Sequence, residues 1–214
     1  MSGSKPPVFT PEALRDALTE LGTLAYDAGR VIDVAVYGGS CLMLVSNFRI
    51  ATADVDAVAA TADQDFLDSA AQAVAKRRGW PRDWLNDGVR TYLSPNVEGL
   101  AQHSLFRTYP SEDRPGLRVF VPVPEYMLAM KLVALRLDPA RGRSDFEDAI
   151  NLMQVTGLQE KEDILRFASR FYPEARASAR LALALDQLWT EYRSRLERPT
   201  HDAPRYLGRS GPQD

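Results

Sequence analysis

The sequence predicts an α+β protein whose strands and helices alternate first and whose last part is all helical. Two observations support this fold class. Short apolar runs with β-branched residues alternate with helical stripes up to residue 122, and only helical patterns follow from residue 123 to residue 198. We therefore expect an α/β core with an N-terminal helix over 1–122, a helical region over 123–198 and a flexible tail over 199–214.

The composition is that of a soluble globular protein. The 214 residues are 45% hydrophobic and 26% charged, which allows a sizeable core. Cys41 is the single cysteine, so an intramolecular disulfide is excluded and a reducing compartment fits. The N-terminus lacks the apolar core of a signal peptide, and no apolar run approaches the length of a membrane span. We expect a cytoplasmic protein without membrane contact.

The elements of the first half follow from capping signals and periodicity. Thr10 as N-cap and Pro11 at the first helical position predict a helix start. Positive charge followed by a glycine over 76–79 predicts the end of a later helix. The patterns predict, in order, a helix to about residue 28, a strand over 31–37, a helix over 40–48, a strand over 54–59, a helix over 63–78, and short strands over 105–109 and 117–121.

The sequence patterns of the second half predict helices. Pro124 is placed to begin a helix over 125–137 that is apolar on nearly all sides, with Lys131 alone in its middle. Ser144 and Glu147 have the spacing of a capping box, which predicts a helix start at that serine. The remaining patterns predict a loop over 138–142, a helix from 144 to 156 that Gly157 stops, a helix over 160–172 and a last, long helix that carries Leu181, Leu185, Leu188 and Tyr192.

A turn of two glycines and a serine lies between the first predicted strand and the helix after it. Gly38 and Gly39 let backbone N–H groups approach a ligand closely, and Ser40 adds a hydroxyl where a helix N-terminus favours an anion. Asp54 and Asp56, as alternate residues of a strand, would point to the same face. Two carboxylates beside such a turn suit a hard divalent cation and a nucleoside triphosphate.

Each of these features also has a purely structural explanation. A double glycine is common as a plain turn, and Lys131 could extend its ammonium to solvent. The joint occurrence favours function, because an ammonium in an apolar helix is costly unless it meets an anion, here a nucleotide phosphate near Asp54 and Asp56. Asp145 follows the presumed N-cap, where an aspartate complements the helix dipole, and Asp148 one turn later could share its face.

Together these residues resemble the nucleotidyltransferase-fold superfamily, the group that shares the catalytic core of DNA polymerase β. Its fingerprint is a Gly-Ser turn followed by an Asp-x-Asp strand, which Gly39-Ser40 and Asp54-Val55-Asp56 match. The chain is most similar to the AbiEii/MenT-like branch, the nucleotidyltransferase toxins of toxin–antitoxin systems. That branch adds a helical lysine and an Arg/Lys-x-Asp-x-x-Asp context, which Lys131 and residues 143–148 match, so the resemblance covers roughly residues 30–155.

The resemblance implies a mixed β-sheet flanked by helices, with a C-terminal helical bundle that completes the active site. It implies transfer of a nucleoside monophosphate from an NTP to an acceptor hydroxyl with Mg²⁺, or alternatively Mn²⁺. In the toxin branch the acceptor can be the tRNA 3′ end, and a cognate antitoxin protein restrains the enzyme. Carried over residue by residue, it assigns nucleotide binding to Gly38, Gly39, Ser40 and Lys131, the metal to Asp54 and Asp56, and catalysis to Asp54, Asp56, Lys131 and Asp145.

Asp145 would either assist the acceptor hydroxyl or complete the metal site. Many superfamily members carry a third carboxylate on a later strand, and the predicted strand around Arg118 offers none. Arg49 could touch phosphate but fits a surface arginine better. Two alternatives to an RNA-directed toxin stay open: a nucleotidyltransferase that modifies a small molecule or a protein, and a nucleotide-binding module without turnover.

A nucleic-acid partner needs a local basic face, because the net charge is −3. Acidic residues lie among the candidates for such a face, so a solvated mixed-charge surface is the better interpretation. The two histidines are isolated, and Cys41 on an apolar helix fits the core. The basic candidates are Arg166, Arg170, Arg176, Arg180 and residues 76–78.

Overall fold

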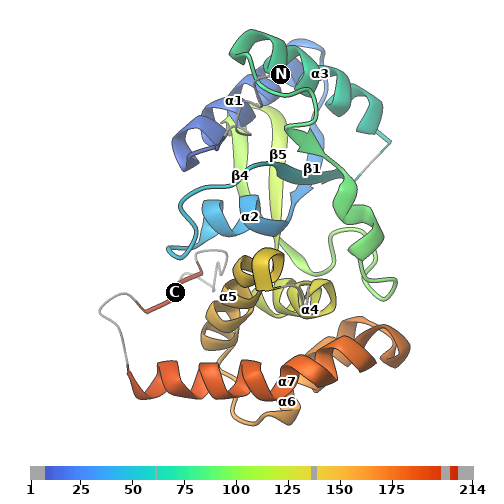
Figure 1. The fold of residues 1–214 in the computed structure, drawn as a ribbon. Coiled ribbons are helices and arrows are strands. Elements are labelled where there is room, and N and C mark those ends of the chain that lie inside the picture. The colour runs from blue at the N-terminus through green and yellow to red at the C-terminus, as the bar shows by residue number, and fades with distance from the viewer. Residues whose placement is uncertain (1–7, 61, 136–138, 199–202, 207–214) are drawn as a thin grey trace, which may run out of the picture.

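The computed structural model describes residues 8–60, 62–135, 139–198 and 203–206 (Figure 1). Within these residues the fold is α+β, with a mixed five-stranded sheet flanked by helices. The strand order is β3-β2-β1-β5-β4, and the strands are β1 Ile32–Val36, β2 Val55–Ala59, β3 Leu85–Asn86, β4 His103–Ser111 and β5 Arg114–Pro122.

The central strand β1 decides where the site lies. It pairs with β2 in antiparallel direction and with β5 in parallel direction, and all its residues except Asp33 are buried. Because β2 runs the opposite way, the chain that leaves β1 lies beside the chain that enters β2. The Tyr37 N–H accordingly donates to the Asp56 carbonyl at 2.9 Å. The glycine turn and the carboxylate strand are therefore neighbours.

Three helices complete the first half, and all three were predicted. The Thr10 side chain caps the first helix by accepting from the Ala13 N–H, and Gly79 ends the third in a left-handed conformation. The backbone of the first helix approaches the sheet directly, since a Cβ on Gly116 would lie 1.9 Å from the Gly22 carbonyl oxygen. These helices are α1 Pro11–Asp27, α2 Gly38–Val45 and α3 Gln64–Arg78.

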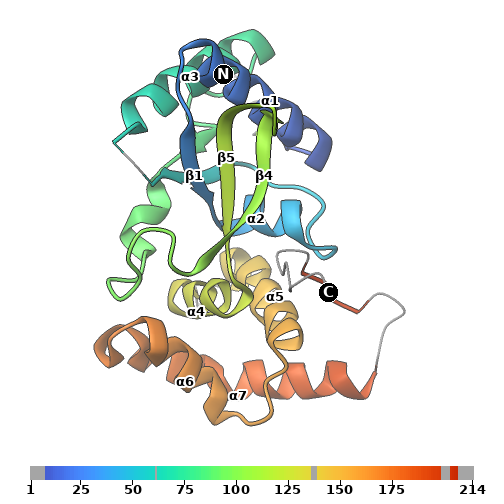
Figure 2. The same ribbon diagram turned by 180° about the vertical axis from the view of Figure 1, so that it is seen from behind.

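Four helices follow the sheet and lie below it in Figures 1 and 2. The first of them packs against the other three. One buried apolar cluster runs from Leu14 in the first helix of the chain to Leu188 in the last, so the regions 1–122 and 123–198 share a core. The four helices are α4 Pro124–Ala134, α5 Pro139–Thr156, α6 Glu162–Phe171 and α7 Glu174–Glu197. None of the described helices is both long and apolar enough to cross a membrane.

Two expectations about the elements were wrong, one in each half of the chain. Helix α5 starts at Pro139, so the predicted loop over 139–142 is helical and Ser144 is no N-cap. A proline fits the first helical position, and one glycine inside a helix costs only about 1 kcal/mol, which packing offsets. The β4–β5 hairpin is also longer than the short strands predicted, because the two strands support each other from His103 to Pro122. Residues 136–138 of the predicted loop and helix end lie outside the described residues.

Part of the expected flexible tail packs on the core. Residues 203–206 lie beside the end of α2, where the Asn47 side chain donates to the Ala203 carbonyl at 3.1 Å and accepts from the Arg205 N–H at 2.8 Å. The Tyr206 hydroxyl donates to the Pro122 carbonyl at 2.5 Å. The rest of the segment 199–214 lies outside the described residues.

Candidate functional site

The site begins at the turn between β1 and α2. Gly38 has φ +62°, a conformation that favours glycine, and a Cβ there would lie 2.5 Å from Asp56 Oδ2. Glycine is therefore required at this position by both the backbone and the neighbouring carboxylate. Asp56 lies directly against the first residue of α2 as a result.

The second half of the turn differs from expectation in one respect. Ser40 is 1% exposed, and its hydroxyl donates to the Tyr37 carbonyl at 2.8 Å, so it points into the fold and away from any phosphate. Gly39 remains at the surface of the cleft beside Thr52, whose hydroxyl donates to the Asp54 carbonyl at 3.0 Å. Thr52 was missed by the sequence analysis, and it fixes the chain that carries the first carboxylate.

Asp54 and Asp56 are coupled electrostatically. Burial, together with the nearby Asp54 carboxylate, raises the pKa of Asp56 to about 6, while the positive charge of Lys131 opposes the shift. Asp54 is exposed and Asp56 is half-buried, and both line the same cavity. Two neighbouring carboxylates repel each other at this cavity wall, and a bound cation would reduce the repulsion.

Two cavities share this wall. One has a volume of about 310 Å³ and the other, an open cleft on the side of the α2–β2 loop, about 500 Å³. Five residues line both cavities, and they come from four places in the chain that only the fold brings together: Gly38, Asp54 with Asp56, Lys131 and Asp145. Ser40 is the one predicted site residue that lines neither cavity.

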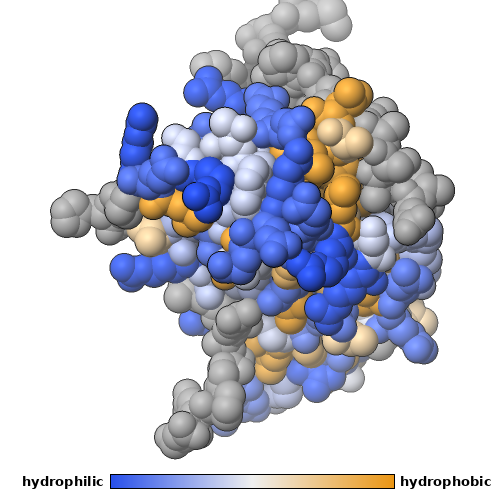
Figure 3. All heavy atoms as spheres, turned by 90° about the horizontal axis from the view of Figure 1, so that it is seen from below, coloured by the Kyte–Doolittle hydropathy of each residue, from blue (hydrophilic) through white to orange (hydrophobic). Residues whose placement is uncertain are grey.

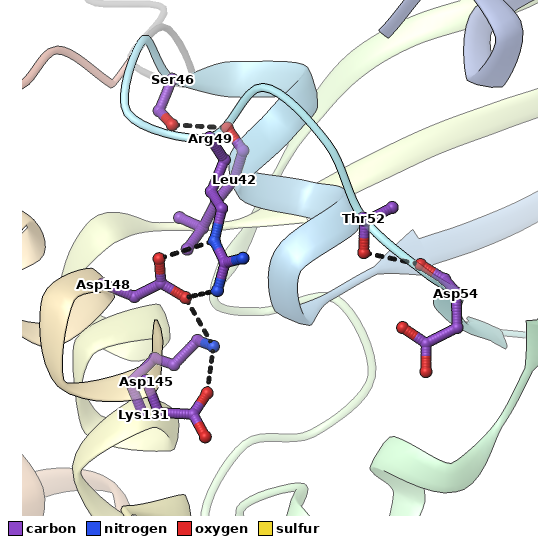
Figure 4. A network of polar contacts seen from close by, with 8 residues as sticks. All are labelled: Leu42, Ser46, Arg49, Thr52, Asp54, Lys131, Asp145 and Asp148. Atoms are coloured by element: carbon purple, nitrogen blue, oxygen red, sulfur yellow. Dashed lines mark hydrogen bonds and ion pairs between the residues drawn. The ribbon is translucent and has the colours of Figure 1, made fainter. Parts of the chain in front are cut away.

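Lys131 is held by carboxylates and does not extend to solvent. Its ammonium lies 2.9 Å from Asp145 Oδ1 and 2.8 Å from Asp148 Oδ2, with only 8% of the residue exposed (Figure 4). Burial by itself would lower the pKa of Lys131, but the charges of Asp148 and Asp145 outweigh it, and the pKa is raised. The lysine is therefore a permanent cation at the edge of the cavity.

Arg49 belongs to the same network, so the expectation of a surface arginine was wrong. Its Nε donates to Asp148 Oδ1 and its Nη2 to Asp148 Oδ2, both at 2.8 Å, and its side chain is 24% exposed. Asp148 is 2% exposed and thus accepts from two cations at once (Figure 4). The Asp-x-x-Asp spacing was a signal for Asp148, whereas nothing local in the sequence pairs it with Arg49, 99 residues away.

The early start of α5 changes the interpretation of Asp145. This residue lies well inside the helix, where complementing the dipole of the first turn no longer explains it. Asp145 and Asp148 are one turn apart and share a helix face, so both carboxylates reach Lys131. Asp145 also lines both cavities.

The donor set fits one hard divalent cation. Among the described residues no group of three or more His, Cys, Asp or Glu side chains could hold a metal ion, and Arg118 of β5 pairs with Asp33 at 2.5 Å. Asp145 is engaged by Lys131, which leaves Asp54 and Asp56. One or two carboxylates, completed by water and substrate phosphates, are a common set of ligands for Mg²⁺.

The remaining candidates have structural roles. Cys41 is buried, as predicted. Burial lowers the pKa of His103 to about 4, and its Nε2 lies 2.9 Å from the Tyr37 hydroxyl, while His201 lies outside the described residues.

The predicted mixed-charge surface is confirmed for three of the basic candidates, Arg77, Arg78 and Arg166. Arg77 and Arg78 pair with Glu20, and Arg166 pairs with Asp163. Among the described residues on the face seen in Figure 3, hydrophilic side chains cover much of the surface, with apolar patches between them. These three basic groups are compensated by neighbouring acids, whereas the Arg170 guanidinium lies 5.2 Å from the centroid of the Phe171 ring. The side chains of Arg176 and Arg180 lie outside the described residues.

Comparison with known proteins assigns no family to the chain: no family model matches, and neither do curated proteins or solved structures. The functional argument therefore rests on the chemistry of the site.

The shared carboxylate predicts a large stability loss when its charge is removed. Asp148→Asn leaves the buried Lys131 and the half-buried Arg49 with one carboxylate between them, so we expect the free energy of unfolding to fall by about 3 kcal/mol in urea denaturation. Asp186→Asn, at an exposed pair with Lys161, should cost less than about 1 kcal/mol. Equal losses in the two variants would contradict the role of Asp148.

The raised pKa of Asp56 predicts that removing its charge stabilises the fold in a pH-dependent way. Because the folded-state pKa of about 6 lies above the ordinary aspartate value of 3.8, ionisation of this carboxyl destabilises the fold increasingly as pH rises from about 4 to about 6. Asp56→Asn should therefore be more stable than wild type above pH 6, by at most about 3 kcal/mol, and similar to it near pH 4. Urea denaturation across this range measures the difference, and the exposed Asp113→Asn is the control. A constant difference at all pH values would exclude the explanation.

Proposed function

We propose that this protein is a metal-dependent nucleotidyltransferase that moves a nucleoside monophosphate from an NTP to an acceptor hydroxyl. The observation that carries the proposal is the convergence of Asp54 and Asp56, the Gly38 turn and the buried ammonium of Lys131 on one cavity. Transfer of this kind depends on alignment and charge neutralisation, for which a cation, a lysine and backbone donors are the main requirements.

The topology supports the nucleotidyltransferase interpretation of the fold. The glycine turn follows β1, and the two carboxylates lie at the start of its antiparallel neighbour β2. The helices after the sheet supply Lys131 from α4 and Asp145 from α5, as expected of a C-terminal bundle that completes an active site. The resemblance implied this arrangement, in which the sheet carries the glycine turn and the Asp-x-Asp pair and the later helices carry the lysine and the downstream aspartate.

The chemistry assigns one task to each group. Asp54 and Asp56 hold Mg²⁺ or Mn²⁺, which when bound supplies positive charge to the reacting phosphate. Backbone N–H groups at Gly38 and Gly39 and the Lys131 ammonium bind phosphate oxygens. A lysine has three N–H donors, and Asp145 and Asp148 accept two of them, which leaves one for the nucleotide.

Asp145 is the carboxylate placed to receive a proton. It lines both cavities, and 22% of its side chain is exposed. In the transfer step the acceptor oxygen forms a bond to the α-phosphorus, the bond between that phosphorus and the bridging oxygen breaks, and pyrophosphate leaves. The hydroxyl proton passes to Asp145.

The open cleft beside the α2–β2 loop is the proposed entry for the acceptor. Its lining includes Arg49, Thr52 and Ser144, and its opening leaves room for a large substrate. We propose the 3′ end of tRNA as the acceptor and an antitoxin as the protein partner, on the strength of the resemblance to toxin nucleotidyltransferases. A small molecule or a protein side chain is the alternative acceptor.

The activity is tested with labelled nucleotides. Purified protein, Mg²⁺ or Mn²⁺, each α-labelled NTP and total tRNA should give labelled RNA, and Asp56→Asn should reduce the rate at least about 100-fold because the charge that binds the metal is halved. The exposed Asp65→Asn in α3 is the matched control and should retain the wild-type rate.

Other outcomes separate the alternatives. Label on a small molecule or on protein would support those acceptors in place of RNA. NTP binding without any labelled product, unchanged in Asp56→Asn, would support a module without turnover and contradict the enzyme.

The toxin role predicts a growth phenotype. Overproduction of the wild-type protein should arrest bacterial growth, and Asp56→Ala at the same protein level should relieve the arrest because transfer is lost. Colony counts after induction, with immunoblots to match protein levels, provide the measurement. Harmless overproduction of wild type, together with no labelled acceptor in the assay above, would remove the toxin interpretation.

A further inference from the structure

The cavity of about 310 Å³ is lined by two chemically different groups of residues, which we call its polar end and its apolar end. The carboxylates and Lys131 form the polar end described above. The other end is lined by side chains that the proposed chemistry does not use, from the 3-10 helix η1 (Gly88–Tyr92) and from α4: Val89, Tyr92, Met127, Met130 and Ala134.

Helical spacing builds both walls of the apolar end. Met127, Met130 and Ala134 are three and four residues apart, so they share one face of α4, and Lys131 lies at the edge of that face. Val89 and Tyr92 are three apart, a spacing that aligns side chains in a 3-10 helix. The two elements are in contact with each other, and the cavity lies between their faces.

Tyr92 stands out among these residues by its exposure. The ring is 41% exposed, whereas Val89, Met127 and Met130 are 8%, 1% and 6% exposed. An aromatic ring with a free surface at the mouth of an apolar cavity leaves apolar area for a ligand to cover. The two methionines opposite adapt to the outline of such a ligand.

The backbone that carries this ring is fixed in place. The Tyr172 hydroxyl donates to the Tyr92 carbonyl at 2.8 Å. The Arg90 side chain donates to Asp87 at 2.7 Å and to Gln64 of α3 at 2.8 Å. In Figures 1 and 2 the segment after β3 descends from the sheet towards α4. The aromatic platform is thus preformed, which lowers the entropic cost of binding a flat ligand.

We propose that the apolar end of this cavity binds the nucleobase of the donor nucleotide, with Tyr92 stacking on one face of the ring and Met127 and Met130 lying against the other. The inference rests on the proposed function and deepens it. A nucleotide has a flat aromatic end and a polyanionic end, and the cavity offers an apolar end and a polar end that takes a cation and phosphate. The volume fits a ligand of this size.

The alternative is that Tyr92 is an ordinary surface tyrosine. Tyr26 of α1 serves as the comparison, because it is 39% exposed and the Arg114 guanidinium lies 4.7 Å from its ring centroid. Tyr92 differs by lining the cavity that also contains Asp54, Asp56 and Lys131. Removing the ring of Tyr92 should therefore change the affinity for nucleotides, whereas removing the ring of Tyr26 should not.

Binding of unphosphorylated and phosphorylated probes tests the proposal. Calorimetry measures the binding of the four nucleosides, the four NTPs and inorganic tripolyphosphate in the presence of Mg²⁺. It should show that Tyr92→Ala lowers the affinity for nucleosides and NTPs about tenfold. Tyr92→Phe should stay within about twofold of wild type because the stacking face remains. Tripolyphosphate has no base, so its affinity should be unchanged in Tyr92→Ala.

Two further variants complete the test. Tyr26→Ala should bind like wild type. Ala134→Phe should fill the apolar end of the cavity and lower the affinity for nucleosides at least about tenfold, while tripolyphosphate still binds. Wild-type affinity of Tyr92→Ala for nucleosides, or an equal loss for tripolyphosphate, would overturn the nucleobase site.

The outcomes also separate this inference from the proposed function. Transfer activity with nucleoside affinity unaffected by Tyr92→Ala would keep the transferase and reject the nucleobase site. Tyr92-dependent NTP binding without any transfer would keep the nucleobase site and reject the transferase. A wild-type protein that binds neither NTP nor nucleoside would reject both.

Discussion

The buried carboxylate of Asp148 is the contact on which the candidate site depends. It accepts from Arg49 of the α2–β2 loop and from Lys131 of α4, and its own helix α5 also carries Asp145. The Asp148 carboxylate thus connects the α2–β2 loop, α4 and α5, which are distant in sequence. A buried ion network of this kind contributes little net stability compared with an apolar core, but it holds its members in a defined arrangement. Here it fixes an ammonium at the cavity wall.

Burial and the charges around the site together explain the raised pKa of Asp56. Arg49 and Lys131 are matched by Asp145 and Asp148, so the network is neutral by itself. Burial, together with the nearby Asp54 carboxylate, raises the pKa of Asp56 to about 6, and the positive charge of Lys131 offsets only part of this rise. The molecule thus keeps two repelling charges at a cost in stability, a pattern typical of sites where binding of a cation relieves the cost.

Features with local signals were predictable from the sequence. Thr10, the Gly38 turn and the alternating aspartates depend on near neighbours, and the structure has a cap, a turn and a strand start there. Contacts across long separations leave no local trace, so the partnership of Arg49 with Asp148 could not be predicted, nor could the wall formed by Tyr92 and α4. The Ser144 capping signal failed because a helix can begin earlier wherever packing supports it.

The link between the sheet and α4 has a geometric consequence. A single residue, Val123, separates the end of β5 from the start of α4, and prolines on both sides restrict its freedom. Since β5 is aligned with β1 by the pairs Ile32–Leu117 and Ala35–Phe120, strand alignment sets how far α4 stands from the glycine turn. Sliding one strand by one residue would displace the lysine by about 3.3 Å. The register of the sheet therefore sets the distance between the two halves of the candidate site, the glycine turn and Lys131 of α4.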